Sequence, residues 1–196
     1  MTRRFILLLT AAALTLAALP APVAAQNLSA GVFGGYFDLS GDEFDDADAG
    51  FGFGGVLAVG VHPRFEIGAG VIRTTHSLEG GGDDDEITAL VIHAEPRARF
   101  PLAGSPVVPF VGARVGWVKE DIDIGGVEAE RDGLGFGAVG GVEVALGPTV
   151  AATLAASFTR VSLGDAEVGG TAIDGTDIEG NVIGLEAGLR FRFGPR

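Results

Sequence analysis

The 196-residue sequence lacks cysteine altogether and contains a single lysine, Lys119. Without cysteine the chain cannot form a disulfide scaffold, a thiolate zinc site, a cysteine nucleophile or a lipid-modified N-terminal cysteine. Lys and Arg together number 13 against 26 Asp and Glu, which gives a formal net charge of −13. This balance argues against nucleic acid as a partner, because neutralising phosphates requires clusters of basic side chains.

Long apolar runs are also missing, except at the N-terminus. There Arg3 and Arg4 precede an apolar stretch over residues 5–19, which is followed by the small residues Val23-Ala24-Ala25. This order predicts a cleavable secretory signal peptide over residues 1–25 and a single mature domain over residues 26–196. A retained signal anchor is the alternative. No later stretch supplies the ~20 consecutive apolar residues that a membrane-spanning helix needs.

The mature sequence instead alternates apolar residues with small or polar ones, and Gly, Asp and Pro interrupt the alternation. A period of two predicts β-strands. We predict eight of them, over residues 28–39, 50–61, 65–77, 87–100, 107–118, 133–146, 149–163 and 181–194. Short connections alternate with long ones over residues 40–49, 78–86, 119–132 and 164–180. The pattern predicts an all-β fold, an eight-stranded antiparallel up-and-down transmembrane barrel with both termini at the short-turn end.

The two faces of the predicted strands differ in chemistry. One face is apolar, as lipid requires, and the other carries glycine, small residues and charge. Ten ionisable residues fall on the second face, which we assign to the lumen: Glu66, His93, Glu95, Arg97, Arg99, Arg114, Glu143, Glu186, Arg190 and Arg192. Isolated buried charges are costly, so we expect a structural network of ion pairs. A gate or a narrow path for small solutes is the alternative, although side chains fill the interior of an eight-stranded barrel.

Aromatic residues are expected on the outer face near both ends of the strands. Near the long connections these are Phe37, Phe51, Phe53, Trp117, Phe136 and Phe158. Near the short turns they are Phe65, Phe100, Phe191 and Phe193. Two such girdles around an apolar zone are typical of a barrel that crosses a membrane.

With these features the chain resembles the small eight-stranded outer-membrane β-barrel proteins of Gram-negative bacteria, the OmpA/OmpX type, over residues 27–194. Its last strand looks like the C-terminal signal that the barrel-assembly machinery reads, with Glu186, Gly188, Phe191 and Phe193 in place. Family members commonly end on the aromatic residue, whereas Gly194, Pro195 and Arg196 follow it here. The resemblance implies extracellular long loops, periplasmic termini, contact with outer-membrane lipids and lipopolysaccharide, and no cofactor.

The four long connections hold 21 of the 26 acidic residues, which predicts a strongly negative rim. Carboxylate oxygens are ligands for Ca²⁺ and Mg²⁺, so weak divalent-cation binding is one interpretation. A solvated, self-repelling rim is the other. No segment fits the twelve-residue calcium-loop pattern, and we predict no defined metal site. Arg73 and Arg160 are expected on the outer face near this rim, where lipopolysaccharide phosphates would lie.

Catalytic residues are not evident. His76-Ser77 is the only candidate for a nucleophile and its base, and adjacent residues on a strand point to opposite faces. We therefore predict a non-enzymatic protein with a structural or surface-interaction role. An outer-leaflet lipid-modifying enzyme and a narrow small-solute channel are the alternatives.

Overall fold

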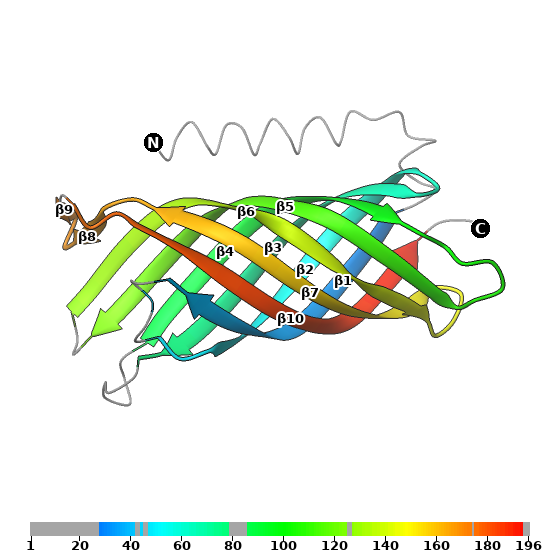
Figure 1. Ribbon diagram of the computed structural model, residues 1–196, viewed down its shortest axis with the longest axis horizontal. Coiled ribbons are helices and arrows are strands. Elements are labelled where there is room, and N and C mark those ends of the chain that lie inside the picture. The colour runs from blue at the N-terminus through cyan, green and yellow to red at the C-terminus, as the bar shows by residue number, and fades with distance from the viewer. Residues whose placement is uncertain are drawn as a thin grey trace.

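A computed structural model describes residues 28–41, 44, 47–78, 86–124, 127–173 and 175–193. Eight strands close into a barrel: β1 (Leu28–Ser40), β2 (Gly50–His62), β3 (Phe65–Ser77), β4 (Glu86–Arg99), β5 (Val107–Ile124), β6 (Val127–Ala145), β7 (Val150–Leu163) and β10 (Ile178–Phe193) (Figure 1). Each pairs antiparallel with its neighbour in the chain, and β10 pairs with β1 to close the ring. The predicted eight-stranded antiparallel barrel is confirmed. The predicted signal peptide and residues 194–196 lie outside the described residues.

No helix within the described part of the chain is long and apolar enough to cross a membrane.

The sequence predicted a third long connection over residues 119–132, and this prediction was wrong. Strands β5 and β6 continue through it as one hairpin, in which Lys119 pairs with Asp132 and Asp121 with Glu130. Residues 164–180 likewise contain two short strands, β8 (Ala166–Val168) and β9 (Thr171–Ile173), and β8 adds to the edge of β6. The extended hairpin and β8–β9 project at one end of the barrel in Figure 1. Acid-rich sequence suggested a solvated loop, but outside lipid both faces of a hairpin tolerate charge while its backbone stays hydrogen-bonded.

Outward positions of the barrel strands carry large apolar side chains, which suits a lipid surface. Of the ten aromatic residues expected on the outer face, eight are exposed there: Phe51, Phe53, Phe65, Phe100, Phe136, Phe158, Phe191 and Phe193. Trp117 is partly exposed, and its indole nitrogen donates to the Asp132 carboxylate at 3.0 Å. Only Phe37 departs from the expected face.

The outward assignment of Phe37 was wrong, because its side chain is 3% exposed and lies inside the barrel. In β1 the even-numbered residues point outward, so Tyr36 takes the outer position and packs edge-on against Phe51 with 5.4 Å between ring centroids. Glycines make room for the Phe37 ring: a Cβ at Gly52 or Gly184 would lie 2.9 Å from it. Phe33 fits the same way, since a Cβ at Gly54 would come within 2.6 Å of its ring. The inner wall therefore combines a few large rings with glycines on neighbouring strands.

Glycine is also required where strands β6 and β7 approach most closely. A Cβ at the inward Gly137 would collide with the Phe158 carbonyl oxygen of β7, whereas at the outward Gly140 the nearest atom lies 3.8 Å away. We expect Gly137→Ala to lower the free energy of unfolding by about 1–3 kcal/mol, because the strands must separate to admit a methyl group. Gly140→Ala is the matched control and should change it by less than about 0.5 kcal/mol. Urea unfolding in detergent micelles, followed by the fluorescence of Trp117, measures both; equal effects would contradict this account.

Candidate functional site

The ten ionisable residues predicted for the lumen lie together inside the barrel, from its middle to its short-turn end. They project from β3, β4, β5, β6 and β10 at inward positions, because their strands alternate regularly there. Eight are buried: Glu66, His93, Glu95, Arg97, Arg114, Glu143, Glu186 and Arg190. Arg99 and Arg192, near the short-turn end, are partly exposed.

Arg114 organises the part of this network nearest the middle of the barrel. Its guanidinium bridges two carboxylates, with nitrogen–oxygen distances of 2.8 Å to Glu95 and 2.8 Å to Glu186. Glu186 also accepts a hydrogen bond of 2.9 Å from the Ser157 hydroxyl. His93 lies 3.7 Å from Glu95. These five residues come from four strands, β4, β5, β7 and β10, so the group connects separate parts of the barrel wall.

Glu143 organises the part nearest the short-turn end. It is 0% exposed and accepts hydrogen bonds from three arginines, at 2.8 Å from Arg99, 2.7 Å from Arg190 and 2.6 Å from Arg192. Arg190 lies 2.8 Å from Glu66 as well. Hydrogen bonds to ionised partners are the strongest available to a protein and offset the desolvation of the charges they join.

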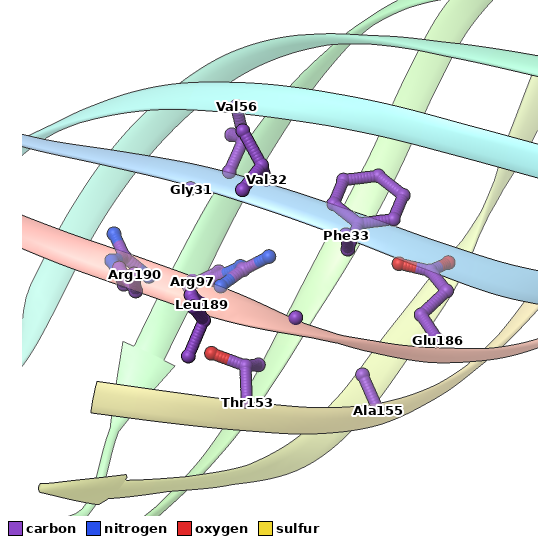
Figure 2. A pocket seen from close by; sticks show the side chains of 11 residues that line it. Gly31, Val32, Phe33, Val56, Arg97, Thr153, Ala155, Glu186, Leu189 and Arg190 are labelled. Atoms are coloured by element: carbon purple, nitrogen blue, oxygen red, sulfur yellow. The ribbon is translucent and has the colours of Figure 1, made fainter. Parts of the chain in front are cut away.

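Arg97 connects the two parts. It donates to Glu95 and lies 3.9 Å from Glu66, while its guanidinium stacks 4.5 Å from the centre of the buried Phe110 ring. Figure 2 shows Arg97, Glu186 and Arg190 around a small gap beside Phe33, a cavity of about 30 Å³. A space of this size holds roughly one or two water molecules. The lumen is therefore filled along this length rather than open.

The network gathers four carboxylates and five guanidiniums, so charge within it is nearly balanced. Sequence reasoning found all of these residues but missed three of their partners. Ser29 accepts from Arg190 at 2.7 Å, Ser157 donates to Glu186, and Phe110 stacks on Arg97. Alternation in their own strands could have placed both serines on the inner face, because each shares the parity of buried neighbours.

Toward the other end the lumen changes character and becomes apolar. Phe44, from the connection between β1 and β2, packs inside with Val118, Val161, Leu163 and Ile178. Near this level Glu120 is only 3% exposed, although the sequence placed it among the solvated acids. It lies three residues beyond Trp117 on the inner face of the extended hairpin, 3.8 Å from Arg131. Burial raises the pKa of Glu120, and the nearby Arg131 opposes that shift.

The outer face of the hairpin holds a separate set of charges. Lys119 lies 2.8 Å from Asp121 and 3.2 Å from Glu130. Farther out, Glu86, Asp123 and Glu128 stand side by side on three neighbouring strands. The acids at positions 42, 43, 45, 46, 79, 83–85 and 174 lie outside the described residues. Among those described, no three His, Asp or Glu residues are arranged to hold a metal ion.

Residues considered for other roles occupy separate places. Arg160 is exposed on the outer face and pairs with Glu179 at 2.5 Å, and Arg73 is exposed as well. His76 is buried, with its Nδ1 atom 3.1 Å from the Asp48 carbonyl oxygen, whereas Ser77 points outward. The candidate dyad is therefore not assembled.

Comparisons with known proteins agree with this architecture. The sequence matches a family model described as outer membrane protein β-barrel domain over residues 9–191. The crystal structure of Neisserial surface protein A is similar, with 19% identity, a TM-score of 0.67, and coverage of 85% of this chain and 97% of that one. OprG from Pseudomonas aeruginosa is similar with 15% identity and a TM-score of 0.58, over 88% of this chain and 98% of that one. The attachment invasion locus protein Ail of Yersinia pestis is similar with 13% identity and a TM-score of 0.52, over 85% of this chain and 97% of that one. At these identities the likeness shows the fold alone. No curated protein sequence matches the chain.

We expect the loss of a charge from a buried ion pair to lower the free energy of unfolding much more than its loss from an exposed pair. Glu143→Gln leaves three arginines short of a counter-charge in the lumen, and we expect it to lower the free energy of unfolding by about 3–5 kcal/mol. Glu179→Gln removes the partner of Arg160 on the outer face and should cost no more than about 1 kcal/mol, because solvent screens that pair. Urea unfolding in lipid vesicles compares the two isosteric changes. A loss for Glu143→Gln no larger than for Glu179→Gln would contradict a stabilising role of the network.

Proposed function

Because the chain belongs to the outer membrane protein β-barrel domain family, we propose that it serves the outer membrane as a closed, non-enzymatic barrel that presents an acidic surface to the outside. The observation that carries this proposal is the separation of its charges. Balanced charges fill the lumen, and unbalanced carboxylates stand on the hairpin that projects beyond the aromatic residues of the outer face.

The filled lumen supports a barrel that does not conduct. Arg114 of β5 pairs with Glu95 of the neighbouring strand β4 and, across the lumen, with Glu186 of β10. Toward the short turns, Glu143 of β6 likewise pairs with arginines of β4 and β10. A solute would have to break several of these pairs at once. Each broken pair leaves a buried charge without a partner, which is costly in a low dielectric.

The projecting hairpin supports a surface role. In its outer face Asp121 lies opposite Glu130, and Asp123 lies opposite Glu128. Like charges directly opposite each other on a sheet are destabilising, and Lys119 lies beside Asp121 and Glu130, the pair nearest the barrel. A positively charged partner would offset the excess of carboxylates on this face. We therefore propose that the long-connection end faces outward and that the hairpin binds positively charged segments of other molecules.

The enzyme alternative has less support. Among the described residues His76 and Ser77 face opposite sides of the wall, His93 lies within the ion-pair network, and His62 is exposed at the end of β2. Nucleophilic catalysis needs a base within hydrogen-bond reach of its nucleophile, and none of these three histidines meets that requirement.

Two further partners follow from the position of outward side chains. Phe191 and Phe193 are exposed at the end of β10, where we propose that, with Glu186 and Gly188, they form the signal for the barrel-assembly machinery. Glu186 and Gly188 point inward, so the outward recognition would rest on the two rings. Arg73 and Arg160 lie on the outer face near the hairpin, within reach of lipopolysaccharide phosphates in the surrounding leaflet.

The closed lumen predicts that the purified protein forms no steady channel in planar lipid bilayers. The reason is that side chains occupy the interior of an eight-stranded barrel and ion pairs hold them there. Single-channel recording at neutral pH measures this directly. A matched preparation of a larger porin provides the positive control. Reproducible, long-lived conductance steps from the folded protein would overturn the non-conducting part of the proposal.

The acidic hairpin predicts binding of an oligolysine peptide to the protein in nanodiscs, measured by fluorescence anisotropy at low salt. Glu86→Gln with Glu128→Gln should weaken binding about fivefold, which corresponds to about 0.5 kcal/mol for each exposed carboxylate. Asp48→Asn with Asp177→Asn removes the same charge from another part of the same rim, away from the hairpin. We expect a smaller effect from this control. Equal weakening by both double variants would show that only net charge matters and would contradict a hairpin site.

A further inference from the structure

The outer half of the lumen contains an apolar chamber above the ion-pair network. Its cavity measures about 60 Å³ and is lined chiefly by apolar side chains, among them Phe37, Leu39, Ile72, Val91, Val118 and Val182. The interior of outer-membrane barrels is generally polar. Six strands contribute to this lining, so the chamber is a feature of the barrel wall and not of one loop.

Phe44 forms the roof of the chamber. Its ring is buried against Val118, Val161 and Leu163, and Gly180 leaves the space that it occupies, since a Cβ there would collide with the ring. Its backbone is held by hydrogen bonds of 2.8 Å to the Gly41 carbonyl and 3.0 Å from Ala47. The ring thus covers the cavity through apolar contact alone.

One polar group in the chamber wall has an unmet hydrogen bond. Glu120 lines the cavity and is 3% exposed, yet its Oε2 atom accepts no hydrogen bond from any described residue. Arg131 lies 3.8 Å away, too far for a hydrogen bond. Arg114, at the floor, is already engaged by Glu95 and Glu186. A buried acceptor without a donor is costly, so a ligand that supplies a donor at this point gains more than an apolar one.

We propose that the outer half of the lumen is a binding chamber for one very small molecule that carries an apolar part and a hydrogen-bond donor, such as ethanol. Its donor meets Glu120 Oε2, and its hydrocarbon part lies against Ile72, Val91 and Val118. An engineered cavity of about 150 Å³ holds the six carbons of benzene, so this smaller chamber suits a molecule of about two or three non-hydrogen atoms. Water that bridges Glu120 and Arg131 is the competing occupant.

Methyl NMR of the folded protein in nanodiscs tests the proposal, with ethanol as the probe. The chamber methyls of Ile72, Val118 and Leu163 should shift and reach saturation. The lipid-facing methyls of Leu154, Ile183 and Leu185 should shift linearly, because the alcohol also partitions into lipid. Chamber methyls that follow the lipid-facing ones without saturation would overturn the proposal and leave water as the occupant.

A second probe tests the role of Glu120 without any mutation. Chloroethane has nearly the same size but no donor, and it should bind the chamber about tenfold more weakly than ethanol. In Glu120→Leu this preference should disappear, while Phe44→Ala should keep it and admit larger alcohols. Equal affinity for the two probes in the unmodified protein would overturn the assignment of Glu120, whether or not the variants fold.

Discussion

The small interior of an eight-stranded barrel is the constraint on which the rest of the structure depends. Closure satisfies every strand's backbone, but it leaves a space that only inward side chains can fill. Where Phe33 and Phe37 point inward, glycines on adjacent strands make room, and the buried Phe110 ring packs against the smaller side chains of Val139 and Ala155. Filling is thus achieved by matching large and small residues across strands, because the backbones have no freedom to move apart.

The same constraint explains why charges can occupy the lumen at all. A buried carboxylate or guanidinium is expensive in isolation, and the narrow interior brings side chains from opposite walls within hydrogen-bond reach. Glu143 meets three arginines and Arg114 meets two carboxylates, so each charge has a partner from another strand. Such pairs add little stability over an apolar filling, but losing one member is costly. The network therefore fixes the register of the strands more than it strengthens the barrel.

Much of the barrel and its charged lumen could be predicted from the sequence, because alternation in a strand determines which residues share a face. Arg190, Arg192 and Glu186 were placed correctly by their own strand alone. Phe37 was not, since its face depends on glycines in β2 and β10 that only the register reveals. The acidic residues over 119–132 led to the wrong prediction of a loop for another reason. Outside lipid a strand can carry charge on both faces, so composition no longer distinguishes a strand from a loop. Phe44 and Glu120 were missed because the chamber they share is made by residues distant in sequence.

Adjacent residues of the hairpin show how the inner and outer faces of one strand differ in their surroundings. Glu120 points into the lumen and is buried beside Arg131, whereas Asp121 points outward to Lys119 and solvent. One step along the strand changes a carboxylate from a wall of the interior to part of an exposed acidic face. Because ion pairs fill the lumen below the chamber, we expect a ligand of the hairpin or of the chamber to stay at this end of the barrel. A route from one side of the membrane to the other would require a different filling of the lumen.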